Sequence, residues 1–166
     1  MKSCTILLSI WLLSSAAVAQ DKPNFSGTWA LDTVKSDFGE LPVPDTQTNV
    51  IDHKDSNIKL TQTIRGQAVP GGEASSERHY TSDGKENSNK VGEQDVKSTC
   101  KWDGRQLVIG TKLETPYGTA EIKDSWELTD GGKQMVVTRN FKGPQGSAIR
   151  DCFSISSNRW LTARKG

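Results

Sequence analysis

The chain has 166 residues, with 21 Lys and Arg against 20 Asp and Glu, and hydrophobic residues make up 33% of it. The basic residues do not gather into a dense block, and a nucleic-acid partner requires a concentrated positive surface that releases counterions. The composition therefore argues against nucleic acid as a partner, and against anionic membrane surfaces for the same reason.

Residues 1–19 have the three-part layout of a secretory signal peptide. Lys2 supplies a positive charge, residues 6–13 are nearly all apolar, and Ala17-Val18-Ala19 forms an A-x-A cleavage pattern. The apolar stretch is too short to span a bilayer, and no apolar run after Gln20 approaches that length. We therefore expect export to the periplasm or the extracellular space, no membrane insertion, and one domain over residues 20–166. The alternative is a buried N-terminal helix.

Period-two alternation of apolar and polar residues dominates the remaining chain. Ile58, Leu60 and Ile64, for example, alternate with charged and hydroxyl residues, which is typical of a half-buried strand. No window places apolar residues at helical spacing over three turns. Asp-Gly pairs and Pro-Gly segments separate the alternating runs, as in tight hairpins. We count eight to ten strands, at about 26–31, 46–53, 57–66, 75–82, 93–102, 105–114, 118–129, 133–142 and 147–156.

Successive strands joined by short turns predict an all-β, antiparallel up-and-down β-barrel. Closure into a barrel removes the exposed edges of one long open sheet. A two-layer β-sandwich is the alternative. Two stretches stand outside the pattern: residues 33–45 form an irregular connection that could fold over one end of the barrel, and residues 86–92 are a polar loop or a weak edge strand.

Two cysteines remain once Cys4 leaves with the signal peptide. An even pair in an exported protein most often forms a disulfide, so Cys100 and Cys152 are expected to be bridged. Simple alternation places Cys100 on the face of Trp102 but Cys152 opposite Phe153, so a β-bulge would have to reconcile the two. The alternative is two buried free thiols.

The segment Phe25-Ser26-Gly27-Thr28-Trp29-Ala30-Leu31 resembles the first strand of the calycin barrels, the lipocalins and fatty-acid-binding proteins. Gly27 and Trp29 match the family's G-x-W. The resemblance implies that Trp29 closes one end of the barrel beneath a basic residue from a late strand, for which Arg150 and Arg159 are both candidates. More narrowly, the chain is similar to uncharacterised lipocalin-like proteins exported by bacteria. From the residues alone, a structural role is expected for Gly27 and for the large, buried Trp29.

Enzymatic chemistry finds no support in the sequence. There is no G-x-S-x-G elbow, and His53 and His79 are interpreted as solvent-facing strand residues. Neither H-x-H nor C-x-x-C occurs, and no phosphate-binding glycine loop is complete. We therefore expect no catalytic residue, no metal and no cofactor.

Charged residues on otherwise apolar faces are the candidate ligand-binding residues. Arg139 shares a face with Val137, and Asp124 shares one with Trp126 on the preceding run. A buried charge is costly unless it is paired or met by a ligand, and an arginine can hold a carboxylate in a bidentate fork. The hypothesis is that Arg139, Trp126 and Asp124 line an internal cavity. The alternatives are an internal Arg–Asp pair without ligand, and faces exposed to solvent at the barrel rim.

These features favour a non-enzymatic protein that binds a small hydrophobic or amphipathic ligand inside a barrel. The second hypothesis is a protein-interaction module, such as an inhibitor or an assembly factor, that contacts its partner through residues 40–45 and 83–92. An enzyme comes third, because no acid–base pair is recognisable.

Overall fold

The computed structural model describes residues 21–39, 42–67, 69–144 and 148–151, and its regular structure there is β-strand with one short 3-10 turn. The predicted signal peptide lies outside the described residues, as do Cys152 and the end of the last predicted strand. The elements are β1 (Gly27–Ala30), β2 (Thr46–Lys54), β3 (Asn57–Arg65), β4 (Glu73–Thr81), β5 (Asp83–Val91), β6 (Gln94–Asp103), β7 (Gln106–Thr115), β8 (Gly118–Thr129), η1 (Asp130–Gly132), β9 (Gln134–Lys142) and β10 (Ala148–Asp151).

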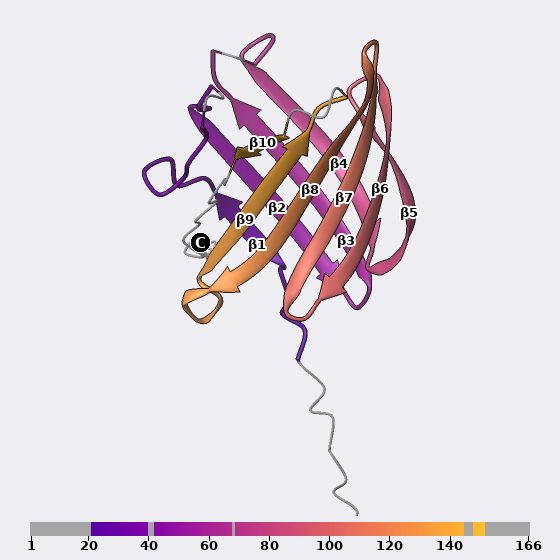
Figure 1. Ribbon diagram of the computed structural model, residues 1–166. Helices are drawn as coiled ribbons and strands as arrows, with labels where there is room; N and C mark the ends of the chain where they lie inside the picture. Colours follow the sequence, from indigo (N-terminus) through magenta and orange to yellow (C-terminus); the bar gives the residue numbers. More distant parts are fainter. Residues whose placement is uncertain (1–20, 40–41, 68, 145–147, 152–166) are drawn as a thin grey trace, which may run out of the picture.

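The strands form two antiparallel sheets in up-and-down order, β1-β2-β3-β4 and β10-β9-β8-β7-β6-β5. Figure 1 shows the two sheets crossing face to face, with the chain entering at the lower end. The predicted all-β, antiparallel fold is confirmed, and each strand predicted between 26 and 142 begins and ends within two residues of its prediction. No helix in the described part of the chain is long and apolar enough to cross a membrane.

Strand β5 is the edge strand that residues 86–92 suggested. Among the described strands, its backbone pairs with β6 only. Asparagine side chains join it to β4 instead. Asn89 accepts a hydrogen bond from the His79 N–H and donates one to the His79 carbonyl, and Asn87 accepts one from the Thr81 N–H. The two sheets therefore meet at a seam closed by side-chain amides. Asp83-Gly84, one of the Asp-Gly pairs expected to form a tight hairpin turn, instead lies at the start of β5, because β4 ends at Thr81 and β5 begins at Asp83 in the other sheet.

Aromatic residues fill the lower end of the molecule, which we call the closed end. Phe25 and Trp29 are fully buried there, and the Trp29 Nε1–H donates to the Phe25 carbonyl at 2.9 Å. The Phe25 ring stacks on Trp102 with 6.0 Å between ring centroids and meets Trp126 edge-on at 5.8 Å. Burial of these large rings supplies much of the core's apolar contact.

The opposite end, which we call the open end, is covered in part by the connection between β1 and β2. Residue 66, in the turn after β3, approaches this connection so closely that a Cβ there would lie 3.1 Å from the Asp45 nitrogen. Gly66 also has a φ of +159°. Only glycine fits at this position, because a side chain would be strained at that φ and would have too little space. Three described residues of the irregular 33–45 segment, Phe38, Pro42 and Pro44, line the cavity between the sheets, as expected for a connection that could fold over one end.

The predicted disulfide is not supported. Cys100 is a free cysteine, completely buried in the core on the inner face of β6. Burial raises the pKa of its thiol to about 12, so at neutral pH it is protonated and behaves as a small apolar side chain. Its predicted partner, Cys152, lies outside the described residues.

Candidate functional site

A cavity of about 230 Å³ lies between the two sheets and extends to the open end. Apolar side chains from both sheets and from the β1–β2 and β3–β4 connections form much of its wall: Leu31, Phe38, Pro42, Pro44, Leu60, Ile64, Val69, Trp126 and Val137. Its charged lining residues are two arginines and one aspartate. A mostly apolar cavity with a few converging polar groups is the usual form of a small-molecule site.

The three sequence-predicted residues come together on this cavity. Asp124 on β8 stands directly opposite Arg139 on β9, and Trp126 stands opposite Val137 in the next inward-facing pair. All three predicted side chains line the cavity. The hypothesis placed them on adjacent strands facing inward, and that geometry is what the structure has. Their contact with a ligand stays a prediction.

Arg139 and Asp124 form a bidentate ion pair. The Arg139 Nε–H donates to Asp124 Oδ1 and Nη2–H donates to Oδ2, each at 2.7 Å. Burial alone would lower the pKa of the Arg139 guanidinium, but the hydrogen bonds and charge of Asp124 outweigh it and raise that pKa. The positive charge of Arg139 is therefore largely neutralised within the protein.

Arg78 is the cavity cation that the sequence interpretation missed. It lies on the inner face of β4, and no carboxylate of the described residues comes within ion-pair distance of it. Among the described residues its Nη2 donates to two neutral oxygens, Gln62 Oε1 at 3.4 Å and Ser76 Oγ at 3.3 Å, and Arg78 is also hydrogen-bonded to the neutral Tyr80 hydroxyl. Its Nε is buried and has no hydrogen-bond partner among the described residues. Among the described residues, the cavity therefore holds one positive charge that no carboxylate balances.

Tyr80 lies beside Arg78 on the same inner face of β4. Burial raises the pKa of its hydroxyl, and the positive charge of Arg78 opposes that rise only in part. The hydroxyl is therefore neutral throughout the ordinary pH range. A neutral hydroxyl next to an unbalanced guanidinium can share an anionic oxygen with it.

A chain of amide side chains holds Arg78 in position. Asn49, almost fully buried on β2, accepts a hydrogen bond from Gln62 Nε2 at 3.1 Å, and Gln62 in turn accepts from Arg78. These residues alternate with outward-facing ones on β2, β3 and β4, as Arg78 does with Glu77 and His79. That alternation could have identified Arg78, but a face made of Ser76, Arg78 and Tyr80 gives no hydrophobic signal that it points inward.

The two histidines differ in environment. His79 is exposed on the outer face, as expected, and its Nε2 lies 3.0 Å from Glu77 Oε1. The expectation of a solvent-facing His53 was wrong, because His53 is buried at the closed end and stacks on Phe25 and Trp102. Within the described ranges no group of three or more His, Cys, Asp and Glu side chains is arranged to hold a metal ion.

Gly27 and Trp29 take structural positions at the closed end rather than positions on the cavity. Gly27 adopts a φ of +148°, and a Cβ there would stand 3.6 Å from the indole Nε1 of Trp29. The side chains of Arg150 and Arg159, the candidates for the basic residue over Trp29, lie outside what the structure describes.

No family model matches the chain, and no curated protein matches it. Among solved structures, the chain is similar to ileal bile acid-binding protein from zebrafish, crystallised with cholic acid. The TM-score is 0.54 at 19% sequence identity, over 81% of this chain and 98% of the zebrafish protein. This likeness shows that the two proteins share a fold, and it agrees with the fold that the first strand's resemblance implied. The similarity to exported bacterial lipocalin-like proteins stays a prediction.

Proposed function

We propose that this protein binds a small amphipathic anion in the cavity between its sheets, without catalysing a reaction on it. The observation that carries the proposal is Arg78, a guanidinium that lines an apolar cavity and has no carboxylate partner among the described residues. A buried charge without a counter-ion is costly, and an anionic ligand removes that cost. The zebrafish protein, whose structure holds cholic acid, supports a ligand of this class.

The size of the cavity limits the ligand. At about 230 Å³ it is larger than the cavity of roughly 150 Å³ that takes up benzene, and smaller than the roughly 300 Å³ at which drug-sized sites begin. One apolar chain or ring with a single anionic head group fits this description. The head group would lie at Arg78 and Tyr80, and the apolar part would lie against Leu60, Ile64 and Val137.

Calorimetric titration with octanesulfonate and with octanol tests the proposal, because the two probes share a chain and differ in charge. We expect one octanesulfonate to bind per protein and octanol to bind more weakly. Replacing Arg78 with Met should weaken the binding of octanesulfonate about tenfold or more, since hydrogen bonds to charged groups contribute about 1.5–3 kcal/mol. Octanol affinity should stay unchanged. Equal binding of octanesulfonate by both proteins, or no binding by the native one, would contradict the proposal.

We also propose that the protein is exported and acts after removal of residues 1–19. The support is the three-part layout of that segment in the sequence. Intact mass of the protein recovered outside the cytoplasm tests this, with Gln20 as the expected first residue. Recovery of the uncut chain from the cytoplasm alone would contradict it.

A further inference from the structure

We propose that His53 is a pH-sensitive latch that holds residues 21–26, the N-terminal segment, against the closed end and so tunes ligand affinity. The effect on ligand rests on the proposed function. The latch itself stands on contacts at the closed end, and it is tested there independently of any ligand.

The ring of His53 uses both nitrogens. Its Nδ1 accepts a hydrogen bond from the Phe25 N–H at 3.2 Å, and its Nε2 lies 3.2 Å from the Asp55 carbonyl oxygen. Because a carbonyl can only accept, Nε2 carries the proton and Nδ1 does not. The contacts therefore define a neutral imidazole in a single tautomer.

The main chain of His53 holds the same segment. Its N–H donates to Ser26 Oγ at 2.9 Å, and its carbonyl accepts from Ser26 Oγ at 3.1 Å and from Asn24 Nδ2 at 3.3 Å. Residues 24–26 are thus fastened to one residue of β2 by four hydrogen bonds, of which only the bond to Nδ1 depends on protonation.

Protonation of Nδ1 would set two donors against each other. The new Nδ1–H would face the Phe25 N–H across the present 3.2 Å, with no acceptor between them. The Phe25 backbone must then move away, or its buried N–H stays without a partner. Acid therefore weakens the attachment of the N-terminal segment.

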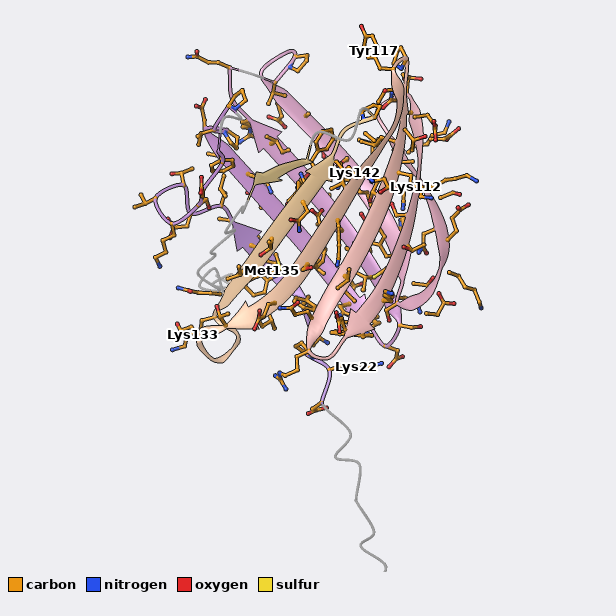
Figure 2. All side chains as sticks on the ribbon, in the orientation of Figure 1. Lys22, Lys112, Tyr117, Lys133, Met135 and Lys142 are labelled. Carbon is orange, nitrogen blue, oxygen red and sulfur yellow. The ribbon has the colours of Figure 1, made fainter. Side chains whose placement is uncertain are left out.

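Other charged groups face the closed end from each neighbouring element. Asp55, in the β2–β3 turn, favours a charged His53 ring, but burial lowers the pKa of His53 more strongly than Asp55 raises it. From the N-terminal segment, Lys22, labelled at the lower end in Figure 2, lies 5.6 Å from the centre of the Trp102 ring. From the β6–β7 turn, Arg105 donates to the Asp21 carbonyl. Asp52 and Lys54 on β2 pair with each other.

Phe25 connects the latch to the cavity. Its ring stacks on His53 at 6.1 Å and meets the edge of Trp126 at 5.8 Å, and Trp126 lines the cavity. When Phe25 moves, Trp126 loses the ring that supports it from the closed end. A ligand that needs Trp126 in place therefore has a higher affinity for the protein with a neutral His53 than for the protein with a charged His53. By linkage, the ligand lowers the pKa of His53 in return.

Nuclear magnetic resonance between pH 8 and pH 4.5 tests the latch without ligand. The chain has two histidines, so His79→Asn assigns the two imidazole signals. We expect the Phe25 amide to lose protection from hydrogen exchange with the same midpoint as the His53 ring, both in the native protein and in His79→Asn. A Phe25 amide that stays protected after His53 has titrated would overturn the latch.

Calorimetry with octanesulfonate, whose charge does not change in this range, tests the coupling. We expect the dissociation constant to rise about fivefold or more as His53 becomes charged, the lower end of usual allosteric couplings. His53→Asn retains an acceptor near Nδ1 and should abolish this rise, whereas His79→Asn should keep it. If the affinity does not change with pH although the Phe25 amide loses protection, the coupling to ligand is overturned and the latch is kept. No binding at any pH would contradict the proposed function and leave the latch to the exchange experiment, which decides it.

Discussion

The side-chain amide of Asn89 takes the place of a peptide group for His79, accepting from its N–H at 2.6 Å and donating to its carbonyl at 2.9 Å. An asparagine amide has the same donor and acceptor geometry as one unit of a β-ladder. It can therefore join β4 to β5 where the two backbones are too far apart to pair directly. This explains how two separate sheets enclose one interior.

Replacing Asn89 with Ala should lower the free energy of unfolding by about 1–2 kcal/mol, because two hydrogen bonds are lost and the His79 backbone groups must turn to water. Urea denaturation measures the loss. Ser88→Ala, on the exposed face of the same strand, is the matched control and should change stability little. A loss for Asn89→Ala no larger than that of the control would show that the seam does not depend on this amide.

Arg139→Met should destabilise the protein by about 1–3 kcal/mol, because it leaves the Asp124 carboxylate inside the barrel without its partner. The expected loss stays below that of a fully buried pair, since 37% of the Arg139 side chain is exposed, against 14% of Asp124. Combining Arg139→Met with Asp124→Leu should restore most of the stability. Additive losses in the double variant, measured by urea denaturation, would show that the two side chains act independently.

Stability should fall as the pH decreases below about 6.5, the ordinary pKa of histidine. Burial lowers the pKa of His53 in the folded protein, so the unfolded chain takes up the proton first and is favoured by acid. This contribution is complete above 6.5 and is lost as pH falls through the folded-state pKa. Thermal unfolding at several pH values measures it. His53→Asn should flatten the profile in that range, and a slope equal to that of the native protein would contradict the assignment.

Cys100 should resist alkylation by iodoacetamide at pH 8 in the folded protein and react once urea unfolds it. Its thiol is buried, and a pKa of about 12 leaves almost no thiolate at that pH. Peptide mass mapping without reductant checks both states. A peptide pair linking Cys100 to Cys152 would contradict the free thiol and restore the disulfide that the cysteine count first suggested.

Contacts between residues that are close in the chain were predictable from the sequence. Hairpin register places Asp124 opposite Arg139, and apolar neighbours such as Trp126 and Val137 show that this face points inward. Strand boundaries follow for the same reason, since alternation and turn residues are local signals. The irregular 33–45 segment was also recognisable, because it lacks alternation and contains Gly39, Pro42 and Pro44.

Arg78 and His53 were not predictable in this way. Alternation divides a strand into two faces, but only hydrophobic residues reveal which face is buried, and the Arg78 face is largely polar. Arg78 reaches the cavity of Asp124 and Arg139 from the other sheet, and His53 meets the Phe25 N–H 28 residues away. Such contacts depend on how the sheets cross and where the N-terminal segment docks, which is settled by packing of the whole chain and not by any local pattern.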